Sequence, residues 1–475
     1  MNATRSDLAR ERAARVLAER ARLQARNDAA GALVAAATPP SAAARPAPAP
    51  GSAATATATA RNAAPPRRNW PLYLFVFLLP LQNIQTGYLP SGGGGLNFLN
   101  LGFLLSLLGA WRVGGTLAGD TTVNRWAVIY IVYSIASLFI GYANIPGMDN
   151  TATLKDAMIA VLMLFVVQKS IVDLEDAKRL LIATMLPIPY MFKVVLVQHD
   201  SVSHWHYSDE LRIQGTFALL GANEFAAFCV TVALVLLGLL LATKLSLRWR
   251  IALAGSIACM ATGVVFGYSR TAYVAILLGV AVIFLLWRGR WKMLLPLVLA
   301  AVVLPTVLPQ SVIDRFDTTT IESDKRDEST DLRFQFWQVA WHNFEEHPLF
   351  GSGYQTFRQR QINPYGMDTH NFFMRTLTEG GIVGALIVLG LFLSLLNATR
   401  NTLRMAPNAS WAHGISLGMM GAWIALVCGN CFGDRFTYYP MIAFFWVYVG
   451  VMLKLQELEG GKDSCLMRRA VSHAG

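Results

Sequence analysis

Residues 230–241 decide the fold: they read Val-Thr-Val-Ala-Leu-Val-Leu-Leu-Gly-Leu-Leu-Leu and contain no charged side chain. The run is continuously apolar, so it lacks the two-residue alternation that is typical of strands in a membrane β-barrel. Similar runs recur from residue 70 to residue 455, and each approaches the roughly 20 residues that a helix needs to cross a bilayer core. The pattern predicts an all-α, polytopic bundle of transmembrane helices.

Composition supports lipid as the solvent of this bundle. The 475 residues are 54% hydrophobic and 15% charged, whereas a soluble domain carries about 25% charged residues. Five cysteines lie mostly in apolar segments, where a thiol behaves as a small hydrophobic group. Cys428 and Cys431 form a C-x-x-C pair without a second pair or a histidine cluster, so we interpret them as structural.

One helical membrane domain is expected over residues 70–475, with about twelve helices. The apolar runs place these helices at 71–89, 96–111, 126–143, 154–168, 180–197, 217–242, 250–267, 271–287, 291–309, 381–397, 412–430 and 438–455.

Residues 1–69 differ in kind from the rest. They contain eleven arginines and four acidic residues. An Ala- and Arg-rich stretch up to about residue 30 favours a helix, and the Ala-, Pro- and Thr-rich stretch 38–66 is typical of a disordered tether. We interpret the segment as a cytoplasmic tail that either rests on anionic membrane lipids or is a solvated extension.

Orientation follows from the lysines and arginines of the short loops, which are retained in the cytoplasm. With the tail inside, residues 309–380 form one long outside loop that contains helices. Only isolated arginines remain in the other outside segments, namely Arg212, Arg270 and Arg435. The cytoplasmic loops then hold Arg112, Arg125, Lys169, Lys178, Arg179, Lys244, Arg248, Arg250, Arg288, Arg290, Lys292, Arg400 and Arg404.

The outside arginines lie where helices meet the membrane surface, at the depth of a lipid head group. A guanidinium stays charged and binds phosphate oxygens with two parallel hydrogen bonds. Several around one cavity would bind a pyrophosphate, whereas a single arginine more often extends to the interface. Because Arg212 and Arg270 are both set in an otherwise uncharged outer face, we favour the phosphate site.

His370 and Asn371 open a helix that enters the membrane from the long loop. An imidazole at this position can accept a proton from a hydroxyl group near neutral pH. The alternative is that the pair only satisfies backbone groups at a helix start. The string from His342 to His347 has the wrong spacing for a zinc protease, and the outside segments contain no Asp-x-Asp pair for Mg²⁺. We therefore expect no metal site.

These pieces together resemble the O-antigen ligase and polymerase family, the Wzy_C-like membrane glycosyltransferases. The resemblance covers residues 70–455 in architecture and is sharpest from residue 212 to residue 384. It rests on Arg212-Ile-Gln-Gly-Thr-Phe217 before Asn223-Glu-Phe-Ala226, Ser269-Arg-Thr271, Arg315-Phe316, Arg333 with Trp337, His347-Pro-Leu-Phe-Gly-Ser-Gly353 with Phe357, and His370-Asn371 with Glu379, Gly380 and Gly384.

The resemblance implies a GT-C-like fold in the bacterial inner membrane and an inverting, metal-independent glycosyltransferase without cofactor. It implies transfer of a glycan from undecaprenyl pyrophosphate to a hydroxyl of the lipid A core or of a lipid-linked repeat on the periplasmic face. The arginines would stabilise the leaving pyrophosphate, with Arg212 and Arg270 first and Arg435 and Arg333 in support. His370 would be the base. The residues that would support the acceptor are Asn371, Glu379 and Trp337.

Two alternatives stay open. Ligase and polymerase need the same arginines and base, so the sequence does not separate them; a polymerase would add a chain-length regulator as a partner. A transporter or flippase for a lipid-linked glycan would also be polytopic, but it usually has related halves and ionisable groups at the bilayer midplane. We see no internal repeat. Lys193 and Glu224 lie near outer helix ends and are predicted to pair with each other. Nucleic acid is not an expected partner.

Overall fold

A computed structural model confirms the all-α prediction. It describes residues 67–88, 97–119, 121–201, 211–217, 220–292, 299 and 328–473. Within these ranges the regular structure is helical, apart from one isolated β-bridge between Thr243 and Ala409. The predicted tail and the predicted helix at 291–309 lie almost entirely outside the described residues, so both stay predictions.

Eight helical segments of the described chain are long and apolar enough to cross a membrane, which makes this a multi-pass membrane protein. They correspond to eight of the twelve predicted helices. In chain order they are α6 (Thr122–Asn144), α7 (Thr151–Ser170), the α8–α9 segment (Leu174–Asp200), α10 (Ala222–Ala242), α11 (Leu247–Phe266), α16 (Phe372–Met405), α17 (Trp411–Cys431) and the first part of α18 (Tyr439–His473).

One other prediction needs adjustment, and two more are confirmed. The predicted helix at 71–89 is two helices, α3 (Trp70–Leu78) and α4 (Gln82–Tyr88). They are separated around Pro80, which has no amide hydrogen to continue the helical ladder. The predicted helices at 96–111 and 271–287 are present as α5 (Phe98–Val113) and α12 (Arg270–Leu286), with 16 and 17 residues.

The core lies around α10, whose side chains are buried along almost the whole helix. This helix packs against α17, α11 and α12, while α17 also packs against α16 and α18 packs against α7. Apolar side chains on the outside of the bundle, such as Val132, Phe139, Leu277 and Leu386, are exposed, as expected for a surface that faces lipid.

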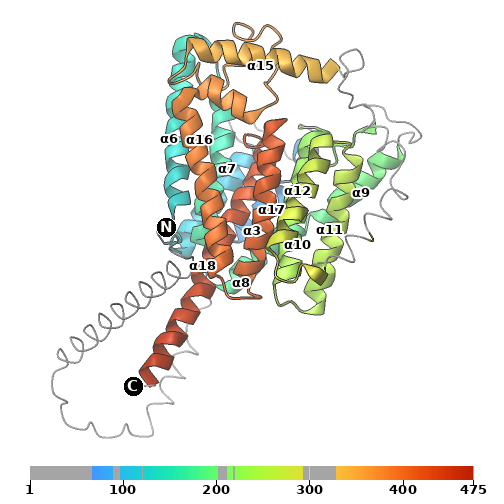
Figure 1. Ribbon diagram of the computed structural model, residues 1–475, viewed down its shortest axis with the longest axis vertical. Coiled ribbons are helices and arrows are strands. Elements are labelled where there is room, and N and C mark those ends of the chain that lie inside the picture. Colours follow the sequence, from blue (N-terminus) through green and yellow to red (C-terminus); the bar gives the residue numbers. More distant parts are fainter. Residues whose placement is uncertain are drawn as a thin grey trace, which may run out of the picture. The chain divides into compact units, whose positions relative to one another are not determined.

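Side-chain contacts distinguish two ends of the bundle. At one end, Lys178 lies 5.8 Å from the ring centroid of Trp411, and Arg288 donates to the Asn408 side chain at 3.0 Å. We call this the basic end, since cations that the sequence assigns to the cytoplasm gather there. At the other end, α15 (Glu328–Glu346) lies across the ends of the spanning helices (Figure 1). We call it the α15 end; which side of the membrane it faces stays a prediction.

At the α15 end, α16 begins at Phe372 and is broken at Gly381, about two and a half turns later. Gly381 has a φ of +61°, and a Cβ there would lie 2.4 Å from the carbonyl oxygen of Leu349. The amides that follow the break belong to Ile382 and Val383, and they donate to the carbonyls of Pro348 and Leu349 at 2.9 and 3.1 Å. A returning loop thus replaces the lost helical hydrogen bonds, which a membrane-embedded backbone requires.

The same loop contacts α6 on its other side. Gly353 has a φ of +110°, and a Cβ there would lie 2.2 Å from the amide nitrogen of Gly141. The Asn144 side chain donates to the Ser352 carbonyl at 2.9 Å, and the Tyr354 amide donates to a carbonyl of α6 at 3.0 Å. The glycines of the His-Pro-Leu-Phe-Gly-Ser-Gly motif therefore allow the loop to lie between α6 and the break in α16.

Candidate active site

His370 lies in a short segment between the loop and α16 that is fixed on both sides. The Trp337 indole donates to the Thr369 carbonyl at 2.9 Å, and the Phe372 amide donates to the Gly433 carbonyl at 3.0 Å. Asn371 is the N-cap of α16, since its side-chain oxygen accepts from the amides of Phe373 and Met374 at 3.0 and 3.1 Å. His370 itself is half-buried with a φ of +52°.

Backbone conformations with positive φ are uncommon for residues other than glycine and gather at functional sites. In the described chain they occur at Tyr268, Gln355, His370 and Ala409. Two of these four belong to the candidate site. His370 is itself a candidate residue, and Tyr268 is two residues before Arg270. At the α15 end, the backbone that carries His370 is thus held in this uncommon conformation by the contacts around it.

The surroundings of His370 favour the neutral form of its imidazole. Burial lowers the pKa of His370 below its ordinary value of about 6.5, and the charges of Arg333 and Arg435 lower this pKa further, while Asp368 opposes them. Two of the predicted phosphate-binding arginines are therefore within electrostatic range of the predicted base. A neutral imidazole can accept a proton, so the protonation state fits general-base chemistry.

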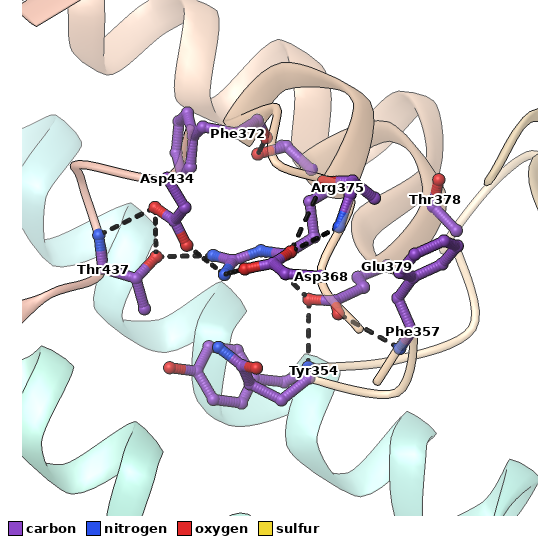
Figure 2. Close-up of polar contacts among 12 residues, drawn as sticks. Tyr354, Phe357, Asp368, Phe372, Arg375, Thr378, Glu379, Asp434 and Thr437 are labelled. Carbon is purple, nitrogen blue, oxygen red and sulfur yellow. Dashed lines mark hydrogen bonds and ion pairs between the residues drawn. The ribbon is translucent and has the colours of Figure 1, made fainter. Parts of the chain in front are cut away.

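Next to His370, one arginine is surrounded by carboxylates (Figure 2). Arg375 is buried and forms ion pairs with Asp434, with Glu379 at 3.5 Å and with Asp368 at 3.9 Å, and it donates to the Thr437 hydroxyl. We call these five residues the Arg375 cluster. Burial alone would raise the pKa of Asp368, but the charges of Arg375 and Arg358 lower it.

The Arg375 cluster joins three segments of the α15 end. The Glu379 carboxylate accepts from the amides of Gln355 and Phe357 at 3.0 and 3.2 Å, which fixes the glycine-containing loop. The Asp434 carboxylate accepts from the amide of Thr437 at 3.1 Å, which fixes the segment after α17. No group of three or more His, Cys, Asp or Glu side chains in the described ranges has metal-binding geometry. The carboxylates of the Arg375 cluster are thus the counter-ions of Arg375.

A second group of polar residues lies at the start of α10. Arg435 is buried and forms an ion pair with Glu224, and Arg212 donates to the side-chain oxygen of Asn223 at 2.6 Å. We call these four residues the α10 cluster. The predicted pairing of Lys193 with Glu224 is therefore wrong, because the carboxylate forms its ion pair with the buried Arg435.

Two helix N-termini meet at this cluster. Neither α10, which begins after Gly221, nor α12, which begins after Ser269, has a side chain that caps its first turn. Such turns present backbone N–H groups and a positive partial charge. A small pocket of about 10 Å³ lies between α10, α12 and α17, and its lining includes Asn223, Ser269 and Arg435. Arg270 is the first residue of α12.

The structure thus brings most of the predicted site residues to one end. Arg333 and Arg435 are both within electrostatic range of His370. Arg212 is connected to this group through neighbouring residues of α10, and Arg270 begins the helix that lines the same pocket. Trp337, Asn371 and Glu379 hold the backbone around the site. Whether they also contact an acceptor stays a prediction.

Sequence reasoning missed three charged residues and one amide at this end: Asp368, Arg375, Asp434 and Asn223. Asp368 and Arg375 flank the His370-Asn371 pair in the chain. Charged residues so close to the outer membrane surface could have indicated that these two belong to the site. Nothing in the sequence pairs Arg375 with Asp434, which is 59 residues away.

Comparison with known families agrees with this geometry. Residues 255–389 match the Wzy_C family model, which describes O-antigen ligase. The chain carries an O-antigen ligase family domain. This domain contains Arg270, Arg333 and His370, whereas Arg212 and Arg435 lie outside the matched residues and join them through the fold. No curated protein matches the chain. The domain implies an enzyme of the ligase or polymerase type that acts on lipid-linked glycans in surface polysaccharide assembly.

Proposed function

We propose that this protein transfers a glycan from undecaprenyl pyrophosphate to an acceptor hydroxyl on the periplasmic face of the bacterial inner membrane. The acceptor is the lipid A core for a ligase and a lipid-linked repeat for a polymerase. The observation that carries the proposal is the position of the His370 imidazole, within electrostatic range of Arg333 and the buried Arg435, at the end where two helix N-termini without side-chain caps meet. The O-antigen ligase domain supports the reaction class.

His370 is the base in this proposal. Its neutral imidazole takes the proton of the acceptor hydroxyl while the hydroxyl oxygen forms a bond to the anomeric carbon of the donor glycan. The bond between that carbon and the pyrophosphate oxygen breaks, and its electron pair leaves with the pyrophosphate. Because the acceptor attacks opposite the leaving group, the configuration at the anomeric carbon inverts. The proton on His370 then passes to solvent.

The arginines act on the leaving group. Negative charge develops on the pyrophosphate as the bond breaks, and donors fixed in place for that charge lower the barrier. Arg212 and Arg270 are the main binding residues, with Arg435 and Arg333 in support, and the first turns of α10 and α12 add their backbone N–H groups. These fixed positive charges make the reaction independent of a metal ion in our proposal.

The direct test is transfer by the purified protein in detergent, with a synthetic polyprenyl pyrophosphate glycan and an acceptor. We expect transfer by the wild type to persist in EDTA. His370→Ala should lower the rate by about 10² to 10⁴-fold, which is typical for loss of a positioned general base, and should retain donor affinity. His342→Ala is the matched control, because His342 is exposed on α15 and should leave the rate unchanged.

Each part of the proposal has its own contrary result. A wild-type rate for His370→Ala would return this histidine to a role in helix capping. Loss of wild-type activity in EDTA would reject metal independence. Detergent removes the two compartments that a flippase needs, so a protein that moves lipid-linked glycan across vesicles but transfers nothing in detergent would be a transporter.

A further inference from the structure

The ion pair between Glu224 and Arg435 places an acidic side chain where the proposed reaction needs a free guanidinium. Glu224 is in the first turn of α10, next to Asn223, so two adjacent residues of one turn contact two arginines, of which Arg435 is distant in the chain. The Arg435 side chain is 5% exposed, whereas the Glu224 side chain is 14% exposed. The carboxylate thus lies on the more open side of the pair.

The space beside this pair is small. The pocket between α10, α12 and α17 measures about 10 Å³, which is close to the volume that one water molecule needs. A pyrophosphate is several times larger than a water molecule, so this pocket cannot hold one. A carboxylate and a phosphate bind a guanidinium with the same fork geometry. One can therefore replace the other on Arg435 without leaving the guanidinium unpaired.

We propose that Glu224 is a positioning residue that competes with pyrophosphate for Arg435, and that it leaves the guanidinium when the donor binds and returns when the product departs. This inference rests on the proposed function. Glu224 keeps a buried arginine paired, because a buried charge without a partner is strongly destabilising. It also limits how tightly the site binds pyrophosphate.

The competition matters most after transfer. Breakage of the bond to the glycan leaves its electron pair on the pyrophosphate, which thereby gains one negative charge relative to the donor. The product therefore binds the arginines more tightly than the donor does. A carboxylate that competes for one of these arginines speeds release of the product, which limits turnover in many enzymes.

Glu224→Gln tests the idea, because the amide has the shape of the carboxylate without its charge. We expect the variant to bind inorganic pyrophosphate and a short-chain polyprenyl pyrophosphate roughly tenfold more tightly, as measured by calorimetry on the full chain in detergent. We also expect a lower kcat, a lower KM for the donor and stronger inhibition by the product. Glu345→Gln is the matched control: it removes an exposed acid of α15 and should change none of these values.

Further variants separate competition from a structural role. Glu224→Asp keeps the charge on a shorter side chain and should give intermediate affinity, so the test survives if Glu224→Gln fails to fold. In an Arg435→Gln background, Glu224→Gln should no longer tighten pyrophosphate binding, because the two residues act on each other. Unchanged or weaker pyrophosphate binding by both folded Glu224 variants would overturn the inference.

Arg212→Ala distinguishes the failure of this inference from failure of the proposed function. If Arg212→Ala binds pyrophosphate as well as the wild type, the site is not a pyrophosphate site and both ideas fall. If Arg212→Ala weakens binding while Glu224→Gln does not tighten it, the pyrophosphate site stands and only the competition by Glu224 is rejected.

Discussion

The Arg375 cluster and the α10 cluster lie at the same end of the bundle, and each has a buried arginine, yet they differ in how much acid surrounds it. Arg375 is compensated by three carboxylates and a hydroxyl. The α10 cluster has two arginines and one carboxylate, and this carboxylate pairs with Arg435. Arg212 contacts the side-chain amide of Asn223, and its Nε has no hydrogen-bond partner among the described residues.

This difference separates an anchor from a binding site. A guanidinium surrounded by carboxylates has no remaining attraction for an anion, so it holds segments of the protein together. A group of arginines with too few carboxylates keeps a net positive charge and unused donors, and both favour a phosphate ligand. A buried arginine at this end is thus either a structural anchor or a phosphate ligand, and the number of carboxylates around it determines which.

The largest expected effect is on stability, from Arg375→Ala. Removal of the guanidinium leaves three buried carboxylates without a counter-ion, and loss of one partner from a buried ion pair costs about 3–5 kcal/mol. We expect a large loss of unfolding free energy, measured by denaturant unfolding in detergent. Arg358→Ala is the matched control: Arg358 is partly exposed and paired with Asp368 at 3.1 Å, and its loss should cost at most about 1 kcal/mol. Equal costs for the two variants would refute the anchor role.

The next effect is on turnover, from Arg270→Lys. Lysine keeps the positive charge but lacks the planar fork that binds two phosphate oxygens at once. We expect turnover to fall roughly tenfold or more, the scale of about 1.4 kcal/mol in transition-state binding, with the unfolding free energy unchanged. Initial rates of glycan transfer and a denaturation curve on the same preparation provide the check. Full activity would mean that only the charge at position 270 matters.

A smaller effect is a shift in pH dependence, from Arg333→Gln. Transfer requires neutral His370, so the rate is lost as pH falls through the pKa of this residue, which lies below its ordinary value. Removal of the positive charge of Arg333 raises this pKa, and the acid limb of the pH–rate profile should move to higher pH. Arg360→Gln, an exposed arginine of the same end, should leave the limb in place. A shift to lower pH would contradict the electrostatic assignment.

The smallest effect belongs to Asn371→Ala. Its side chain caps α16 by accepting from the amides of Phe373 and Met374, and loss of such a cap typically costs about 1 kcal/mol. We expect a modest decrease in unfolding free energy, measured by denaturant unfolding. Asn371→Asp should retain most of the stability, because aspartate also caps helices well. A large loss of stability in both variants would indicate a contact beyond the cap.

Sequence predicted the spanning helices and the two ends of the bundle because both are local properties, set by apolar run length and by cations in short loops. It failed at Pro80, where one proline divides an apolar run that hydropathy alone presents as continuous. It also failed for Glu224, which pairs with a residue 211 positions away and not with Lys193. Such pairing depends on how α10 and α17 pack, and periodicity within one helix does not contain that information.

The candidate site shows the same division. Arg212, Arg270, Arg435 and His370 could be singled out because isolated polar groups beside apolar runs are costly and need a reason. The different role of Arg375 could not be predicted, since the sequence does not show which arginines are surrounded by carboxylates. Glu379 is an example: it was predicted to support the acceptor, and the structure shows that its carboxylate holds Arg375 and two loop amides.

The most direct measurement of this account compares two arginines of the α15 end for donor binding. Arg212 has an amide as its partner, whereas Arg358 has a carboxylate and the Tyr438 hydroxyl. Calorimetric titration with a synthetic polyprenyl pyrophosphate glycan should show strongly weakened binding for Arg212→Ala and wild-type binding for Arg358→Ala. Equal affinities for the two variants would contradict the claim that Arg212 and the α10 cluster form the pyrophosphate site.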